Sequence, residues 1–250
     1  MSVIPDKNNR LQKIISLTKR AAEQMLASGQ REIPSPTAQP HVTQTVPTDN
    51  APDKELKMLE AEVMDCKKCN LSKTRIKPVF GAGDSKAKIM FVGEGPGYEE
   101  DRKGEPFIGR AGQLLTREIE NAGLSRKSVY ITNIVKCHPL RDPAHPEARG
   151  NDRPPSPQEL SLCIPYLWKQ IELINPEIIC TLGAPAARAL TNVKQGISQM
   201  RGQVVRVFLA GRQRNVFISF HPAYLLRNPQ ELGKFTEDMA KLVGLVKERR

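Results

Sequence analysis

The stretch that decides the fold is residues 88–112, which read KIMFVGEGPGYEEDRKGEPFIGRAG. The first five residues, KIMFV, form a short apolar run typical of a buried strand, and a glycine-rich turn follows at once. Such a turn after a strand commonly cradles an anion. Four acidic residues nevertheless occupy the same loop between positions 94 and 101, which is unexpected for a plain phosphate site.

On both sides of this stretch the sequence alternates between apolar strands and helices. The pattern predicts strands over 88–92, 129–135, 177–183, 204–208 and 215–220, and helices over 111–123, 156–174, 184–191 and about 229–246. Apolar strands separated by helices indicate an α/β fold with a parallel sheet covered on both faces.

Three polar segments fall at the carboxyl ends of these predicted strands. They are the turn GEGPG after the first strand, Asn133 in the second, and FHPAYLLRNP after the last. Parallel α/β sheets bind ligands at this edge, so we expect the three segments to meet there although they lie far apart in sequence.

The amino-terminal fifth of the chain differs in composition from the rest. Apolar residues spaced three or four apart over 7–28 predict an amphipathic helical segment within residues 1–30, which either docks an unknown protein partner or stays solvated. Residues 31–53 are rich in Pro, Thr and Gln and predict a disordered linker. The folded domain is then expected over 54–250.

Charge and hydropathy narrow the class of partner. The net charge is +11, of which +10 belongs to residues 54–250, and a basic folded domain favours a nucleic-acid partner over a membrane. No apolar run is long enough for a membrane helix, and no signal-peptide core follows the first residue. We therefore expect an intracellular, cytoplasmic monomer in a reducing compartment.

In such a compartment, the five cysteines are expected to be metal ligands or buried core thiols rather than to form disulfides. Cys180 lies inside an apolar strand, where a buried thiol is natural. Cys66 and Cys69 form a CxxC pair, whereas Cys137 and Cys163 are isolated. Four ligands suit tetrahedral zinc or an iron–sulfur cluster, and the wide spacing favours [4Fe–4S]. The alternative is one pair plus two core thiols.

At this point the motifs carry a resemblance to a known family. GEGPGYEED, GEPFIGRAGQLL, ITNIVKC and FHPAYLLRNP, with four cysteines in this order, resemble the thermostable-type (family 4) iron–sulfur uracil-DNA glycosylases over roughly residues 58–247. The resemblance implies a three-layer α/β/α sandwich around a four-stranded parallel sheet. It also implies removal of uracil from single- or double-stranded DNA, and a [4Fe–4S] cluster held by Cys66, Cys69, Cys137 and Cys163.

The chemistry of this family accounts for the acidic loop. When the glycosidic bond breaks, the base leaves as an anion and the sugar becomes cation-like. Matched to the family, Gly93 and Gly95 belong to the turn that contacts uracil, and Glu94 stabilises the sugar and positions water. Glu100 is expected to close the pocket near uracil C5. Phe107 is expected to stack on the base.

The second half of the expected site comes from two other strand ends. Asn133 matches the family's base reader, because its carboxamide offers uracil both a donor and an acceptor. His221 matches the second catalytic residue and is expected to donate to uracil O2. Leu225 and Leu226 are expected to form the wedge that replaces the flipped base, with Arg227 on a phosphate.

The match departs from the family in the loop 138–156, which is longer than expected. A related branch traps the sugar covalently on a histidine here, and His138 and His145 lie in the loop, although the basic KRRIH run of that branch is missing. No catalytic lysine is recognisable, so we expect base removal without strand cleavage. The alternative is a non-catalytic iron–sulfur nucleic-acid-binding module associated with a polymerase. A third possibility, a phosphate-loop nucleotide-binding enzyme, is rejected because the sequence lacks the Gly-Lys-Ser/Thr signature of that loop.

Overall fold

The structure, a computed structural model, describes residues 51–247; the predicted segment 1–30 and most of the predicted linker lie outside that range. Residues 51–53, which we expected to belong to the linker, form the first turn of the helix α2 (Ala51–Met64). Asp53 suits this turn because a carboxylate near a helix amino terminus is favourable, and it also accepts a hydrogen bond from the Ser85 hydroxyl.

Six strands form one mixed sheet. They are β1 (Ala82–Gly83), β2 (Ile89–Gly93), β3 (Tyr130–Asn133), β4 (Ile178–Leu182), β5 (Val204–Leu209) and β6 (Arg212–Ser219). Their order is β1-β3-β2-β4-β6-β5. The central strands β3, β2, β4 and β6 are parallel, which confirms the expected four-stranded parallel sheet, while β1 and β5 add an antiparallel edge on each side.

The strand β5 lies outside the four parallel strands and runs antiparallel to β6, because the turn between β5 and β6 is very short. Ala210 and Gly211 are the only residues between the two strands, and their φ angles are +47° and +78°. Two consecutive residues with positive φ form the kind of tight turn that joins antiparallel strands, whereas a parallel pair needs a long crossover.

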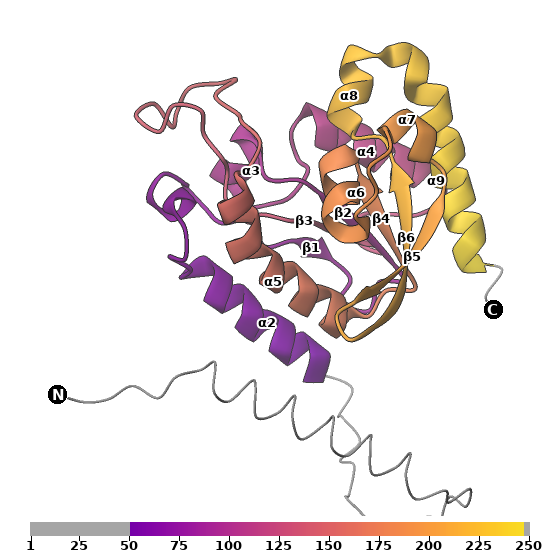
Figure 1. Ribbon diagram of the computed structural model, residues 1–250, viewed down its shortest axis with the longest axis horizontal. Helices are drawn as coiled ribbons and strands as arrows, with labels where there is room; N and C mark the ends of the chain where they lie inside the picture. Colours follow the sequence, from indigo (N-terminus) through magenta and orange to yellow (C-terminus); the bar gives the residue numbers. More distant parts are fainter. Residues whose placement is uncertain (1–50, 248–250) are drawn as a thin grey trace, which may run out of the picture. The chain divides into compact units, whose positions relative to one another are not determined.

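The helices cover both faces of the sheet. They are α3 (Tyr98–Lys103), α4 (Arg110–Asn121), α5 (Pro157–Ile174), α6 (Ala184–Thr191), α7 (Ile197–Met200), α8 (Pro222–Arg227) and α9 (Leu232–Lys247), with 3-10 turns η1 (Asn70–Lys73) and η2 (Pro229–Glu231). α4 and α9 cover one face, α5 and α6 cover the other, and α2 packs on α5 (Figure 1).

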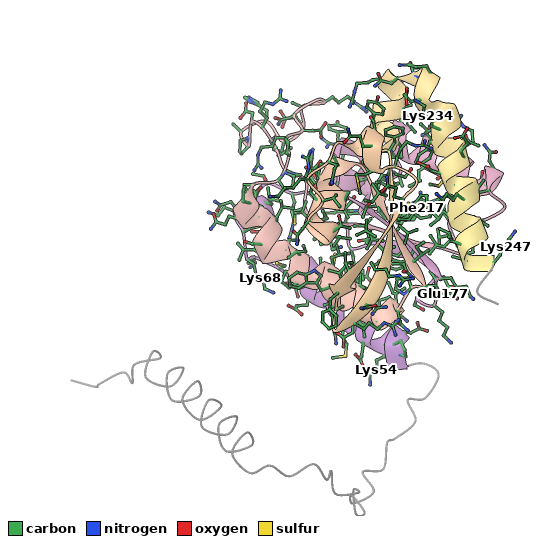
Figure 2. The ribbon with its side chains drawn as sticks, turned by 45° about the vertical axis from the view of Figure 1, so that its right-hand side comes forward. Lys54, Lys68, Glu177, Phe217, Lys234 and Lys247 are labelled. Carbon is green, nitrogen blue, oxygen red and sulfur yellow. The ribbon has the colours of Figure 1, made fainter. Side chains whose placement is uncertain are left out.

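Alternate residues of each central strand feed the two cores. Phe91 points into the core beneath α4 and α9, whereas its neighbour Met90 points into the core beneath α5 and α6. Phe217, fully buried in β6, lies in the middle of the domain (Figure 2). Cys180 belongs to the same core as Phe217, as its apolar strand predicts.

The helix that later carries Cys163 begins as predicted. Ser156 accepts a hydrogen bond from the Glu159 N–H, the Glu159 side chain accepts one from the Ser156 N–H, and Pro157 occupies the first turn. This reciprocal capping box fixes the start of α5. Within residues 51–247, no helix has both the length and the apolar content needed to span a bilayer.

Candidate active site

A cleft of about 640 Å³ lies at the carboxyl edge of the parallel strands. Residues predicted from all three strand ends line it: Glu94, Gly95, Glu100, Phe107, Asn133, His221 and Arg227. The strand order explains the convergence, since β2 lies between β3 and β4 and β6 lies beside β4. The expectation that these segments meet at one edge is therefore confirmed.

Gly93 lies beneath the cleft rather than in its lining. It pairs with Asn133 in the register of β2 and β3. A Cβ atom added at Gly93 would lie 2.4 Å from Asn133 Oδ1 and 2.5 Å from Phe107 Cζ. Any side chain here would therefore displace both groups, so this glycine is what lets the amide and the aromatic ring share one space.

Asn133 is the buried polar residue at the end of β3. Only 1% of it is exposed, and among the described residues no group donates a hydrogen bond to its Oδ1 atom. A buried amide oxygen without a partner costs about 1–3 kcal/mol. Because Asn133 also lines the cleft, a ligand that donates a hydrogen bond there would recover that cost.

His221 caps the amino terminus of α8. Its Nδ1 atom accepts a hydrogen bond from the Ala223 N–H at 3.1 Å. In the neutral ring the proton therefore lies on Nε2, which makes Nε2 a donor. Burial, with a smaller contribution from the Arg227 cation, lowers the pKa of His221 from 6.5 to about 4. The side chain is thus a neutral donor near pH 7.

Phe107 is held in a strained conformation beside His221. The two ring centroids lie 5.7 Å apart, and the φ of Phe107 is +52°, a region that bulky residues rarely adopt. Arg126 donates to the carbonyl oxygens of Phe107 and Pro106 at 3.0 and 2.7 Å. Gly112 makes room, since a Cβ there would lie 1.8 Å from Phe107 O.

Glu100 fastens the other side of the Phe107 loop. Its Oε1 atom accepts hydrogen bonds from the Ile108 and Gly109 N–H groups, both at 2.9 Å, while the residue also lines the cleft. Arg126 therefore holds the loop by donating to two of its backbone carbonyl oxygens, and Glu100 holds it by accepting from two of its backbone N–H groups. Sequence reasoning missed this clamp, because both residues act on main-chain atoms and no motif spacing marks such contacts.

The neighbouring acids differ in their surroundings. Burial raises the pKa of Glu94, which lines the cleft. Asp101 is fully buried and accepts a hydrogen bond from the Ile76 N–H, while Arg102 stacks on the Tyr98 ring. Its burial removes it from any contact with solvent or substrate.

The two leucines of the expected wedge have different environments. Leu225 is 2% exposed and belongs to the core beneath α4 and α9, so it cannot enter a duplex without leaving the core. Leu226 is 38% exposed. The next residue, Arg227, lines the cleft. The wedge prediction is therefore restricted to Leu226.

The long loop 138–156 forms a wall of the cleft that sequence reasoning did not foresee. Arg149 lies 4.5 Å from the Tyr98 ring centroid and forms an ion pair with Glu99. His138 is buried and hydrogen-bonded to Asp152. Among the described residues that line the cleft, neither His138 nor His145 is found.

The four predicted ligand cysteines converge at a second place. Cys66, Cys69, Cys137 and Cys163 line one small apolar cavity, and none forms a disulfide. Arg75 donates to Cys137 Sγ at 3.1 Å, and the Lys136 N–H donates to Cys163 Sγ at 3.3 Å. Burial raises the pKa of the Cys137 thiol to about 11, and Arg75 opposes this shift.

This donor set fits a sulfur-ligated group. N–H donors directed at cysteine sulfurs are the usual outer contacts of iron–sulfur clusters. In residues 51–247, no three Cys, His, Asp or Glu side chains are grouped as closely as ligands of a single metal ion. The convergence of four thiols was predicted; Arg75 and Lys136 were not, although a lysine within the apolar run ITNIVKC was a visible signal.

The fold and the two sites together define the class of this protein as an α/β/α domain with a polar cleft at the strand ends and a separate cysteine site. Residues 80–243 match the uracil DNA glycosylase superfamily, and the chain belongs to that superfamily.

Within it, the chain is similar to proteins named type-4 uracil-DNA glycosylase. The relative from Archaeoglobus fulgidus is 42% identical over 185 residues, 72% of this chain and 88% of the relative. The one from Saccharolobus solfataricus is 44% identical over 192 residues, 75% and 84% of the two chains. The Thermotoga maritima protein is 40% identical over 196 residues, 77% and 95% of the two chains. These matches place the chain in the type-4 family.

Proposed function

We propose that this protein removes uracil from DNA by hydrolysing the N-glycosidic bond of a flipped-out deoxyuridine. The observation that carries the proposal is the amide oxygen of Asn133, which has no hydrogen-bond partner within residues 51–247 and lines the same cleft as His221 and Phe107. A planar base that presents an N–H to this oxygen would satisfy it. Uracil does so with N3–H, whereas cytosine has an acceptor at that position.

The cleft supplies a complementary charge for each half of the breaking bond. The C1′–N1 bond breaks with its electron pair going to uracil, and the His221 Nε2–H donates to uracil O2 as negative charge builds there. Glu94 faces the cation-like sugar; its burial means that its charge is poorly solvated, so it gains from a cation beside it.

The remaining steps use water and the clamped loop. Glu94 positions a water whose oxygen bonds to C1′, and the proton that this water loses passes to the solvent while the uracil anion takes up a proton, which leaves free uracil and an abasic site. Phe107 stacks on the base, Glu100 approaches C5, and Leu226 occupies the space left in the duplex with Arg227 on a phosphate. The proposal includes no lyase step, so the abasic strand should stay intact.

We further propose that Cys66, Cys69, Cys137 and Cys163 hold a [4Fe–4S] cluster. The support is their convergence and the N–H donors on two of the sulfurs. The cluster would tie the segment 66–69 to the end of β3 and to α5, a structural role. Iron and sulfide analysis of the purified chain should give about four of each per chain. One zinc per chain with no iron would refute the proposal.

The decisive test of the activity is direct. The purified chain is incubated with single- and double-stranded oligonucleotides that contain one uracil, and free uracil is measured; oligonucleotides with thymine at that position are the control. We expect uracil release and strands that break only after alkali. A folded, iron-containing chain that binds DNA but releases no uracil would instead favour the non-catalytic binding module.

A further inference from the structure

Lys136 is a fully buried lysine at the end of β3, between the two sites. Lysine is almost never buried unless its charge is paired. Its ammonium nitrogen lies 2.7 Å from Thr132 Oγ1, 2.6 Å from the Asn133 carbonyl oxygen and 2.6 Å from Gln170 Oε1. All three N–H donors of the ammonium are therefore used.

None of the three acceptors carries a charge. Across residues 51–247, no carboxylate forms an ion pair with Lys136, and a buried cation without a negative partner is strongly unfavourable. Two cysteines adjoin Lys136: its backbone N–H donates to Cys163 Sγ, and Cys137 is the next residue. Thiolates that hold a cluster would supply the missing negative charge.

The acceptors of Lys136 are themselves fixed. Thr132 Oγ1 donates to the Phe80 carbonyl oxygen, and Gln170 Nε2 donates to the same oxygen and to the Tyr130 hydroxyl. Gln170 lies on α5, the helix that also carries Cys163. A fully satisfied buried network of this kind has one arrangement and little freedom.

The same network ends at the base reader. Lys136 holds the backbone carbonyl of Asn133 while the side-chain oxygen of Asn133 faces the cleft without a partner. We infer that Lys136 is a positioning residue, which couples the cysteine site to the cleft by fixing Asn133. The inference rests on the proposed function, and it gives the cluster a role beyond tying segments together.

The test compares Lys136→Met with the surface control Lys169→Met. Methionine has a similar length but no donors, whereas the Lys169 side chain is 43% exposed and forms an ion pair with Glu172. We expect Lys136→Met to lose iron, to exchange the amide hydrogens of residues 130–133 at least about tenfold faster, and to release uracil about 10- to 100-fold more slowly, the scale expected for a small misplacement of a substrate contact. Lys169→Met should change none of these.

A double-mutant cycle separates positioning from general structural damage. If Lys136 acts through Asn133, Lys136→Met in the Asn133→Ala background should slow release less than about threefold further. Multiplicative losses would overturn the inference, and so would normal iron content and normal amide exchange in Lys136→Met. If Lys136→Met does not fold, Gln170→Met, which removes one acceptor and keeps the ammonium, should show the same changes to a smaller degree; no change there would also overturn it.

Failure of the proposed function would look different. An unaltered chain that releases no uracil would refute the activity, whereas the iron content and amide exchange of the variants would still decide whether Lys136 links the two sites.

Discussion

The cleft and the cysteine cavity lie at opposite ends of the buried Lys136 network, yet they are built on different principles. The cleft encloses about 640 Å³, is lined by charged groups and, within the described part of the chain, leaves the Asn133 oxygen without a partner. The cysteine cavity is small and apolar, and two of its thiols, Cys137 and Cys163, already accept N–H hydrogen bonds.

The two ligands that we propose differ in how long they stay bound. A substrate that enters and leaves needs space and polar groups that only the substrate satisfies, so part of the binding free energy is withheld until it arrives. A resident cofactor needs ligands and surroundings that are complete at all times. Mutations should therefore separate into two kinds: cysteine variants that lower stability, and cleft variants that lower activity in a stable chain.

The largest effect should follow removal of one cavity cysteine. Cys137→Ala should lose all bound iron and lower Tm by about 10 °C or more, because binding of the cluster contributes to folding. Iron analysis and thermal unfolding followed by circular dichroism measure both. Cys180→Ala is the matched control, since Cys180 is equally buried but lies in the core away from the cavity. It should keep its iron. Loss of iron in both variants would contradict the assignment of the ligands.

The next largest effect should come from the cleft donor. His221→Asn keeps an oxygen that can cap α8 but removes the Nε2–H, so Tm should hardly change. The kcat for uracil release should fall about 10²- to 10³-fold, as for other preorganised donors. The control is His145→Asn, because His145 is exposed and its ring forms a hydrogen bond with the exposed Asp142. A fall in kcat of less than about threefold would contradict the role of His221.

A smaller effect should follow loss of the clamp on Phe107. Arg126→Met frees the two carbonyl oxygens that Arg126 holds, so the strained φ of Phe107 can relax and the ring can move. We expect KM for uracil-containing oligonucleotides to rise about tenfold, part of the ~1–3 kcal/mol that one stacked base contributes. In the Phe107→Ala background the same change should add little.

The control for the clamp is Arg117→Met, an exposed arginine on α4. If Arg126→Met raised KM equally in the presence and absence of the Phe107 ring, Arg126 would be a contact to DNA rather than a support for Phe107.

Much of the fold was predictable because strand and helix periodicity carry it. The central strands and the capping box at Ser156 follow directly from local pattern. The antiparallel pairing of β5 could not be predicted from local pattern. It depends on the two positive φ angles at Ala210 and Gly211, and an alanine at the first position does not indicate such a turn. The small strand β1 has only two residues and no pattern to detect.

The candidate site was predictable where a side chain meets the ligand and hidden where it meets the backbone. Asn133 and His221 were identified from their match to the family's motifs, and their convergence was expected because the carboxyl ends of parallel strands meet at one edge of a sheet. Arg126 acts on carbonyl oxygens 19 and 20 residues away, which no spacing rule anticipates. Leu225 and Leu226 are adjacent and chemically identical, so only packing could separate the core leucine from the exposed one.

The smallest effect is the pH dependence, and it distinguishes two groups in the cleft. Burial lowers the pKa of His221 from 6.5 to about 4, so the ring stays a neutral donor from pH 8 down to about 5. Burial instead raises the pKa of Glu94 above its ordinary 4.5, and Glu94 must be ionised to face the sugar cation. A plot of kcat against pH should therefore be level near neutrality and fall on the acid side at the pKa of Glu94.

The lowered pKa of His221 also makes the stability of the folded chain depend on pH. Between pH 6.5 and about 4 the unfolded chain binds a proton that the folded chain excludes, so this contribution to stability is present above pH 6.5 and is lost as the pH falls towards 4. Glu94→Gln removes the carboxylate and should flatten the acid limb of kcat. If a break near pH 6.5 persisted in that variant, His221 would titrate as an ordinary histidine, which would contradict its lowered pKa in the folded chain.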